Sequence, residues 1–476
     1  METVIMERWK SFMKQTCAII LAAGKGTRMK SNQPKVLAQV LFKPMLGYVI
    51  DSCKHSQITD ICVVTGHQSE MVEQYLDGLE GNFTIVKQEQ QKGTGHAVIC
   101  AKEFIESHRG QDVLVLYGDT PCLDNQTILE AHQLHQQQQN AITVVSAVIE
   151  DPTGYGRVIR NGETFEKIVE QKDASLQQLE IQEINAGVYW FAADKLLCAL
   201  QALTSNNAQG EYYLPDTIAI TQQQGNRVGC YRALCSDIIR GANSRRELYQ
   251  LNEFMRQKVI DKHLDQGVEF VSIDGVYIAP DAVIGTDTVI LPGTILKEQV
   301  VIGEHCSIGP NTLIQRSTVG NRVTLNCVQC YQSKIHDDVD IGPFVHIRPN
   351  SEIHHHVHIG DFVEVKNSVI GAGTGISHLT YVGDSDVGKN VNFGCGVVTV
   401  NYDGVHKHRC TIKDGAFIGC NTNLVAPVTI GENGYTGAGS TITEDVPAQA
   451  LGIARARQQI KEEFSTKKLA GRKKKV

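Results

Sequence analysis

Residues 411–431 of the chain read TIKDGAFIGCNTNLVAPVTIG, and this stretch decides the fold of the C-terminal half. An aliphatic residue recurs at every sixth position, and the residues in phase are Ile412, Ile418, Leu424, Ile430 and Ile442. An apolar residue at every sixth position is typical of a parallel β-helix, in which each step is a short strand and a turn and three steps close a coil of about 18 residues. The stretch therefore predicts a solenoid whose aliphatic side chains stack inside.

The same period extends upstream, often as an aliphatic residue followed by glycine. These pairs are Ile284-Gly285, Ile302-Gly303, Ile308-Gly309, Ile341-Gly342 and Ile359-Gly360. The period is interrupted between Val397 and Ile412, where Asn401-Tyr402-Asp403-Gly404 intervenes. Because loops that leave a regular scaffold often carry function, we expect the interruption to protrude as a functional loop.

The N-terminal half has a different pattern, in which short apolar runs alternate with amphipathic stretches. The expected strands are Cys17–Leu21, Asp60–Thr65, Phe83–Val86, Asp112–Tyr117, Ile142–Val148 and Ala186–Trp190, and the expected helices are Pro44–Ser52, Ser69–Leu79 and Gly95–Ser107. This alternation predicts a mostly parallel sheet that helices cover on both faces, with a site at the carboxyl ends of the strands.

The fold class that follows is α/β, with a Rossmann-like domain followed by a left-handed parallel β-helix of hexapeptide repeats. We expect an N-terminal extension at 1–15, the Rossmann-like domain at 16–240, a helical linker at 241–265, the β-helix at 266–446 and a tail at 447–476. The linker follows from the polar and charged stretch Ala242–Asp265, which reads as one helix.

Composition excludes several classes of protein. The hydrophobic share is 42%, with 43 glycines and 12 prolines, as in soluble globular chains. A net charge of −7 argues against nucleic-acid binding, and the basic runs Lys467–Lys468 and Arg472–Lys475 are expected to be a solvated tail. Because the sequence contains no apolar run of about 18 residues, we expect no membrane insertion.

The cysteines and a histidine tract are read as structural. Most of the 14 cysteines lie in apolar runs, and Cys327–Cys330 is a lone C-x-x-C motif. A zinc site of that kind needs a second pair, so we expect reduced thiols in a cytoplasmic protein. The histidines His354, His355, His356 and His358 suggest a metal, but they lie among repeat turns and are expected to form a solvated loop.

A glycine-rich loop, Leu21 to Met29, follows the first strand directly. Glycines there let backbone N–H groups approach phosphate oxygens, and Arg28 and Lys35 supply cations. The loop matches neither the P-loop nor the dinucleotide-binding motif. Further along, Asp119 ends the apolar run Val113–Tyr117, where a carboxylate serves either as a turn cap or as a Mg²⁺ ligand.

The N-terminal half resembles the sugar-nucleotide pyrophosphorylase family. The motifs that carry the resemblance are Leu21–Met29 with Pro34-Lys35, Gln88 to Ala97, Gly118–Pro121, Gly154–Arg157, Ile168–Glu170 and Glu183–Gly187. With the hexapeptide half, the chain from about Cys17 to about Arg455 resembles the bifunctional GlmU family. The resemblance implies synthesis of UDP-N-acetylglucosamine by acetyl transfer from acetyl-CoA to glucosamine 1-phosphate, then uridylyl transfer from UTP with Mg²⁺.

The resemblance also implies the residues of the nucleotide site. Arg28 and Lys35 would neutralise phosphates, and Asp119 and Asn243 would hold Mg²⁺. UTP and the sugar nucleotide would contact Leu21, Ala22, Ala23, Gly24, Lys35, Gln88, Gly93, Thr94, Tyr117, Gly118, Asp119, Gly154, Glu170, Asn185 and Asn243. The chain departs from the family at Pro215, where threonine is more frequent, so Pro215 is left out of the site.

For the acetyltransferase half, the resemblance implies His378 as the proton acceptor, because imidazole titrates near neutral pH. Glu364 is expected to orient His378. Glucosamine 1-phosphate would contact Arg348, Lys366, Tyr381 and Asn392, and acetyl-CoA would contact Cys395, Asn401, Tyr402, Cys420, Ala438 and Arg455. Cys395 and Cys420 stand where alanine and serine are more frequent, but contacts there are expected to use the backbone.

Two alternatives stay open at this point. One is a single-activity pyrophosphorylase whose solenoid is regulatory or oligomerising, and the other is a noncatalytic scaffold of the same two folds. The intact phosphate and metal motifs argue against the scaffold. The residues His378 to Tyr381 with Asn401-Tyr402 argue against a solenoid that is only regulatory.

A homotrimer packed through the β-helix is expected, with small molecules as the other partners.

Overall fold

The computed structural model describes residues 16–207 and 209–470. The chain divides into two compact units, and the division follows Met255, inside helix α10 (Arg245–Asp265). The expected extension at 1–15 and the run Arg472–Lys475 lie outside the described residues, whereas Lys467 and Lys468 lie exposed on helix α11 (Phe464–Ala470). No helix in the described part of the chain combines the length and apolar character needed to cross a membrane.

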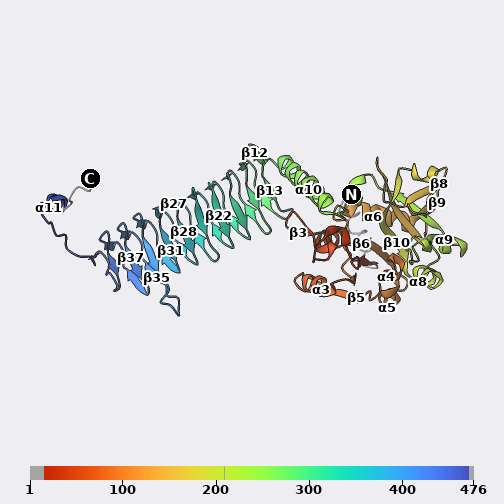
Figure 1. Cartoon of the computed structure of the whole chain (residues 1–476), viewed down its shortest axis with the longest axis horizontal. Coiled ribbons are helices and arrows are strands. Elements are labelled where there is room, and N and C mark those ends of the chain that lie inside the picture. Colours follow the sequence, from red (N-terminus) through yellow and green to blue (C-terminus); the bar gives the residue numbers. More distant parts are fainter. Residues whose placement is uncertain (1–15, 208, 471–476) are drawn as a thin grey trace. The chain divides into compact units, whose positions relative to one another are not determined.

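The first unit is built on a nine-stranded sheet (Figure 1). Its strands are β1 (Thr16–Leu21), β4 (Ile61–Thr65), β5 (Phe83–Lys87), β6 (Asp112–Tyr117), β7 (Ile142–Val148), β8 (Arg157–Asn161), β9 (Thr164–Val169), β10 (Glu183–Ala192) and β11 (Val228–Arg232). The main path runs β11-β7-β10-β6-β1-β4-β5. Only β10 in this path is antiparallel to its neighbours, which confirms the predicted, mostly parallel sheet.

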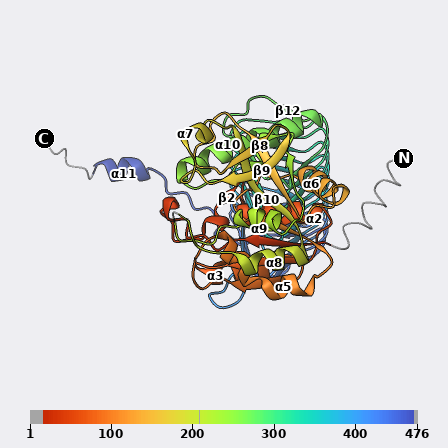
Figure 2. The same cartoon turned by 90° about the vertical axis from the view of Figure 1, so that its right-hand side faces the viewer.

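Helices pack on both faces of this sheet. Helices α2 (Met45–His55), α3 (Ser69–Asp77) and α6 (Asn125–Gln137) share one core with the sheet. Helices α4 (Thr94–Cys100), α5 (Lys102–Ser107), α8 (Ala193–Ala202) and α9 (Asp216–Gln223) share the other, and α5 and α8 lie side by side in Figures 1 and 2. The remaining short elements are η1 (Thr27–Met29), η2 (Lys35–Leu37), β2 (Gln39–Val40), β3 (Lys43–Pro44), α7 (Leu176–Leu179) and η3 (Ser236–Ile239).

Two helix predictions need correction. The stretch Gly95–Ser107 forms α4 and α5 rather than one helix, because the Ala101 N–H bonds to the Val98 carbonyl in a tighter turn. The linker helix begins at Arg245 rather than Ala242. Ser244 and Glu247 exchange hydrogen bonds across the first turn and so fix its start.

The second unit is a parallel β-helix whose coils stack as a ladder (Figure 1). One sheet holds β12 (Glu269–Phe270), β15 (Val289–Ile290), β18 (Ser307–Ile308), β21 (Thr324–Leu325), β24 (Asp340–Ile341), β27 (His358–Asp361), β30 (Gly375–His378), β33 (Asn392–Phe393), β36 (Phe417–Ile418), β39 (Tyr435–Thr436) and β41 (Leu451–Gly452). The second sheet holds β13 (Tyr277–Ile278), β16 (Ile295–Leu296), β19 (Leu313–Gln315), β22 (Val328–Tyr331), β25 (Val345–Ile347), β28 (Glu364–Lys366), β31 (Tyr381–Gly383), β34 (Val398–Val400), β37 (Asn423–Val425) and β40 (Thr441–Ile442). The third holds β14 (Val283–Ile284), β17 (Val301–Ile302), β20 (Thr318–Val319), β23 (Lys334–Ile335), β26 (Glu352–Ile353), β29 (Val369–Ile370), β32 (Ser385–Val387), β35 (Cys410–Ile412) and β38 (Val428–Ile430).

The register of the coils confirms the six-residue period. Ile335 pairs with Ile353, 18 residues later, and both are buried. Ile302 pairs instead with Val319, and Val319 pairs with Ile335, so these coils are shorter by one or two residues. The short coils explain why the sequence phase changes between Ile308 and Ile341. The interruption after β34 forms a loop with a Tyr402–Lys407 bridge, and it protrudes beside β35 in Figure 1.

Candidate active sites in the two domains

The glycine-rich loop lines a cavity of about 430 Å³ at the carboxyl ends of β1 and β6. Gly26 has φ +56°, and a Cβ there would lie 2.7 Å from the Cβ of Lys35. Glycine at 26 therefore lets the loop close against Lys35. The lining residues are Leu21, Ala23, Gly24, Lys25, Gly26, Thr27, Arg28, Lys35, Val36, Gln88, Gln91, Gly93, Thr94, Ala97, Tyr117, Asp119, Glu211 and Asn243.

Lys35, Asp119 and Asn243 converge within this cavity although they are far apart in the sequence. The Lys35 ammonium donates to the Asp119 carboxylate and to the Asn243 side-chain oxygen. Gly241 makes the approach possible, because a Cβ on it would lie 2.4 Å from the Asp119 carbonyl oxygen. The Asp119 carboxylate oxygen and the Asn243 amide oxygen thus both face the Lys35 ammonium. Carboxylate and amide oxygens are the ligands that Mg²⁺ prefers.

Gln88 forms the opposite end of the cavity and is 4% exposed. Its amide nitrogen donates to the Gly93 carbonyl at 3.1 Å and lies 3.0 Å from His96 Nδ1. Gly93 has φ +100°, and a Cβ there would lie 2.5 Å from the Tyr212 carbonyl oxygen. The sequence analysis missed Gln91, whose side chain donates to the Ala23 carbonyl at 2.9 Å and so ties this end to the glycine-rich loop.

Tyr117 lines the cavity, and Glu170 and Asn185 belong to the same domain. Burial raises the pKa of Tyr117, and the neighbouring Glu170 carboxylate raises it further. Burial also raises the pKa of Glu170. The Asn185 amide nitrogen donates to the Tyr189 hydroxyl at 2.5 Å at an irregularity in the β7–β10 register. Glu170 and Asn185 are partly exposed and are not among the residues that line this cavity.

A second cavity of about 670 Å³ shares Arg28 and Asn243 with the first. Gly154 lines it at φ +91°, with Tyr155 and Glu247. The remaining residues expected in the nucleotide site, Ala22 and Gly118, are not among the residues that line the first cavity. The Ala22 N–H bonds to the Val64 carbonyl and the Gly118 N–H bonds to the Leu21 carbonyl, which aligns the strand ends.

In the β-helix, His378 has a carboxylate partner, but it is Asp361 and not Glu364. The His378 Nδ1 atom lies 2.7 Å from Asp361 Oδ1. Within the described chain, the Glu364 carboxylate accepts from Arg348 Nη1 at 2.7 Å and does not contact His378, so the orienting role of Glu364 stays a prediction. Glu364 belongs to the sheet of β28, whereas Asp361 and His378 are register partners in the sheet of β27 and β30.

A cavity of about 290 Å³ gathers three cations of the β-helix: Arg348, Lys366 and Lys407. Asp384 also lines it and accepts from Lys366 Nζ at 3.3 Å. The proximity of Lys366 lowers the pKa of Lys407. Because three cations face one carboxylate, the cavity has an excess of positive charge and suits an anion. Lys407, on the interrupting loop, was missed by the sequence analysis.

Asn401 connects the interrupting loop to this cavity. Its amide nitrogen donates to Asp384 and lies 3.4 Å from the Tyr381 hydroxyl. Asn401 is 8% exposed, whereas Tyr402 is 56% exposed. The structure therefore brings Arg348, Lys366 and Tyr381 together as expected, and it adds Asp384 and Asn401, the latter expected to contact acetyl-CoA.

Three of the residues expected to bind acetyl-CoA lie in successive turns at one corner of the β-helix, whereas Asn401 and Tyr402 belong to the interrupting loop. The Asn421 N–H bonds to the Cys395 carbonyl, and the Gly439 N–H bonds to the Cys420 carbonyl, so the turns holding Cys395, Cys420 and Ala438 stack. Asn392 is exposed on β33, which pairs with the strand of His378. Arg455 is exposed beyond β41. Within the single chain, these side chains are not enclosed in the Arg348 cavity.

The structure bears on three further expectations. All 14 cysteines have free thiols. Pro215 precedes α9 with φ −55°, a position where proline suits a helix start. The histidine tract was expected to be a solvated loop, which fits the exposed His355 and His356 but is wrong for His354, because that residue is half-buried and stacks on His336.

Comparisons with known proteins agree with this division of the chain. Residues 17–236 match the nucleotidyl transferase family, and residues 281–316, 332–367 and 409–444 match the bacterial transferase hexapeptide family. The bifunctional protein GlmU of Clostridium perfringens is 47% identical over 443 residues, which cover 93% of this chain and 97% of the relative. The bifunctional protein GlmU of Acetivibrio thermocellus is 45% identical over 457 residues, covering 96% and 98%.

Among solved structures, a UDP-glucose pyrophosphorylase complexed with UDP-glucose covers 51% of this chain and 99% of its own, with a TM-score of 0.44 and 19% identity. The identity to curated relatives extends over nearly the whole length of both chains. The two matched families fall on the two units that the structure separates. The chain therefore belongs to the GlmU family of bifunctional enzymes, with a nucleotidyltransferase domain followed by a hexapeptide-repeat acyltransferase domain.

Proposed function

We propose that the chain makes UDP-N-acetylglucosamine by two transfers at two separate sites. The β-helix transfers acetyl from acetyl-CoA to the amine of glucosamine 1-phosphate. The N-terminal domain then transfers uridylyl from UTP to N-acetylglucosamine 1-phosphate and releases pyrophosphate. The observation that carries the proposal is the meeting of Lys35, Asp119 and Asn243 in a glycine-lined cavity.

The uridylyl transfer needs positioning and charge neutralisation more than a protein nucleophile. The phosphate of N-acetylglucosamine 1-phosphate is already an anion, and it attacks the α-phosphorus of UTP in line with the pyrophosphate leaving group. Arg28 and Lys35 both line the cavity and would neutralise the charge that develops on the phosphates. The backbone around Gly24 would hold the phosphates, because no Cβ blocks their approach.

Asp119 and Asn243 fit a Mg²⁺ ion, because their oxygen atoms point at one position beside the phosphate loop. When bound, Mg²⁺ would supply positive charge that stabilises the negative charge of the phosphates. In the structure, the Lys35 ammonium contacts the oxygen atoms of Asp119 and Asn243. When Mg²⁺ is bound, this ammonium would turn toward the phosphates. The Gln88 amide and the backbone at Gly93 would read the uracil edge, and Gly154, Glu170 and Asn185 would contact the sugar unit.

The acetyl transfer needs a base, since the amine of glucosamine 1-phosphate attacks only after it loses a proton. His378 would accept that proton at Nε2, because Asp361 holds Nδ1. The amine nitrogen forms a bond to the thioester carbonyl carbon, the bond from that carbon to sulfur breaks, and coenzyme A leaves as the thiol after protonation. Asp361 would fix the ring orientation and stabilise the protonated imidazole.

The Arg348 cavity would bind the phosphate of glucosamine 1-phosphate. Arg348 presents a planar fork that matches phosphate oxygens, and Glu364 holds the fork in place. Lys366 and Lys407 supply the remaining positive charge. Tyr381 and Asn392 would contact phosphate or hydroxyl oxygens near this anchor.

We further propose that acetyl-CoA binds between subunits of a homotrimer. Asn401, Tyr402, Cys395, Cys420, Ala438 and Arg455 are the residues assigned to it. Several of them lie on an open corner of a single β-helix, and one flat surface does not enclose a molecule of that size.

The free thiols also support a reducing compartment, which we propose is the cytoplasm.

The proposal is tested by assaying both transfers with the purified full-length protein. Coenzyme A release with glucosamine 1-phosphate and acetyl-CoA reports the first transfer, and pyrophosphate release with UTP and N-acetylglucosamine 1-phosphate reports the second. Both are expected, the second only with Mg²⁺. A protein that catalyses only one of them contradicts the bifunctional assignment.

A further inference from the structure

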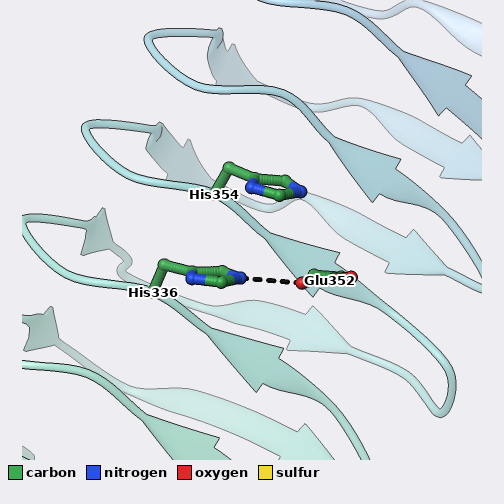
Figure 3. Close-up of side chains that lie close together, drawn as sticks. All are labelled: His336, Glu352 and His354. Carbon is green, nitrogen blue, oxygen red and sulfur yellow. Dashed lines mark hydrogen bonds and ion pairs between the residues drawn. The ribbon is translucent and has the colours of Figure 1, made fainter.

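One cluster of metal-ligating side chains lies outside both candidate sites (Figure 3). His336, Glu352 and His354 place one possible ligand atom each within 4.8 Å of one another. His336 Nε2 lies 2.7 Å from Glu352 Oε1. The rings of His336 and His354 stack with centroids 4.7 Å apart and an interplanar angle of 8°. The three side chains therefore face one small volume at the surface of the β-helix.

The β-helix itself fixes the positions of these residues. Ile335 and Ile353 are buried register partners in β23 and β26, and each is followed directly by one of the two histidines. Glu352 precedes Ile353, so Glu352 and His354 flank a buried residue and point outward together. Backbone bonds from His336 to the Ile353 carbonyl and from His354 to the Ile370 carbonyl continue the ladder.

The two histidines occupy a position that is glycine in most coils. The equivalent residues, each following the buried aliphatic residue of its strand in the third sheet, are Gly285, Gly303, Gly320, Gly371, Gly388 and Gly431. The glycine is sterically required in neighbouring coils, because a Cβ on Gly371 would lie 2.4 Å from the backbone of Gly388. Imidazoles on two adjacent coils, with glycine at the equivalent position on either side, thus form a local feature, and the His355 ring lies beside His336 with centroids 4.9 Å apart.

The charge states of the cluster suit a cation. The hydrogen bond from His336 lowers the pKa of Glu352 and favours its carboxylate form. Burial and the neighbouring His336 lower the pKa of His354 and favour the neutral imidazole, whose lone pair is the metal-binding form. Lys334 Nζ, 3.7 Å from Glu352 Oε1, is the competing cation. Glu352 and Lys334 also line a cavity of about 650 Å³, so an ion has access from solvent.

We propose that His336, Glu352 and His354 form a site for a divalent transition-metal ion, with Zn²⁺ as the reference ligand. Two imidazoles and one carboxylate are a donor set that zinc accepts, and the fourth position would hold water. Binding replaces the His336–Glu352 hydrogen bond with two metal–ligand bonds, and Nε2 of His336 gives up its proton. The ion would connect two successive coils. This site differs in ligand chemistry from the oxygen donors Asp119 and Asn243.

The test is Zn²⁺ binding to the full-length protein after treatment with a chelator and a reductant. Isothermal titration is expected to give one site per chain that Glu352→Gln and His354→Ala each weaken at least about tenfold, as is usual for loss of one ligand. His358→Ala is the matched control, because His358 belongs to the same tract but pairs with Asp340 on another sheet. Circular dichroism checks that each variant is folded.

Cobalt substitution distinguishes this site from the 14 thiols, which also bind zinc. Co²⁺ at two imidazoles, one carboxylate and water gives a four-coordinate visible spectrum that lacks thiolate charge-transfer bands. That spectrum, lost in His354→Ala and kept in His358→Ala, is the expected result. Absence of Zn²⁺ binding to the wild type, equal binding by His354→Ala and His358→Ala, or a thiolate spectrum would each overturn the proposal.

Discussion

Asp361 and His378 are register partners on adjacent coils of the β-helix, and Asp361 Oδ1 lies 2.7 Å from His378 Nδ1. They are 17 residues apart in the sequence, which is the length of one coil at this point. The hydrogen bond lowers the pKa of Asp361, so the carboxylate stays ionised beside the imidazole. Because the pairing occupies Nδ1, the proposed proton acceptor of His378 is Nε2.

Replacing His378 tests this assignment of the base. His378→Ala is expected to lower kcat for acetyl transfer by roughly 10²–10⁴-fold, the usual contribution of a positioned general base. Asp361→Asn should cause a smaller loss and change the pH profile of kcat, because the imidazolium loses its stabilising carboxylate. Coenzyme A release measures both. Normal acetylation by His378→Ala would assign the proton transfer to another group.

Lys407 is predicted to bind the sugar phosphate from the interrupting loop. Lys407→Ala should raise KM for glucosamine 1-phosphate about tenfold with little change in kcat, because one charge-assisted hydrogen bond to phosphate is lost. Lys389→Ala, which removes an exposed lysine elsewhere on the β-helix, is the matched control. The KM of Lys407→Ala would equal that of the control if the cation did not contact substrate.

The N-terminal unit is predicted to work without the β-helix when α10 is kept whole. A chain ending at Asp265 should retain pyrophosphate release, since every residue of the nucleotide cavity precedes it. A chain ending at Gln250 loses Leu251 and Met255, which are 3% and 7% exposed. Losing such buried side chains costs about 2–5 kcal/mol each. Urea unfolding should show the shorter chain to be much less stable, and equal stabilities would contradict the packing argument.

His263 is predicted to make the β-helix unit sensitive to acid. Its side chain is 1% exposed, and burial, with Lys262 nearby, lowers its pKa from 6.5 to about 4. Because the folded state disfavours the protonated ring, the contribution of His263 to stability is complete above pH 6.5 and is lost as the pH falls toward 4. The loss is on the order of 3 kcal/mol. His263→Leu should flatten this part of the stability curve, whereas His305→Gln, at an exposed site, should not.

Much of the fold follows from the sequence because its periods are strong. Six-residue spacing predicted the β-helix, and Asp112–Tyr117 and Ile142–Val148 are strands with the predicted bounds. The strands β8, β9 and β11 were missed. Gly162 and Glu163 form the two-residue turn between β8 and β9, with Gly162 at φ +61°, and short flanking runs obscured this hairpin signal. In β11, Gly229 interrupts the apolar run.

The sequence predicted residues of the candidate sites only where these residues belong to recognisable sequence motifs. The Gly24–Arg28 loop and Asp119 lie where strand ends meet, as expected. Asp361 was missed because it contacts His378 from the neighbouring coil. The turns set the length of that coil, so the separation of the two residues does not follow from the six-residue period. The family resemblance implied Glu364 as the partner of His378. The two residues are 14 positions apart, which is not the length of a coil. Lys407 was missed because the path of an inserted loop does not follow from the repeat.

The measurement that tests the central claim most directly is complementation between two variants. Asp119→Asn removes a proposed Mg²⁺ ligand and should lower uridylyl transfer at least about 10²-fold, and His378→Ala removes the base of the other domain. Neither variant alone should convert glucosamine 1-phosphate, acetyl-CoA and UTP into UDP-N-acetylglucosamine at an appreciable rate. Their mixture should do so, because the acetylated sugar phosphate diffuses from one protein to the other. A mixture that stays inactive, or one variant that loses both transfers while folded, would contradict two separate sites.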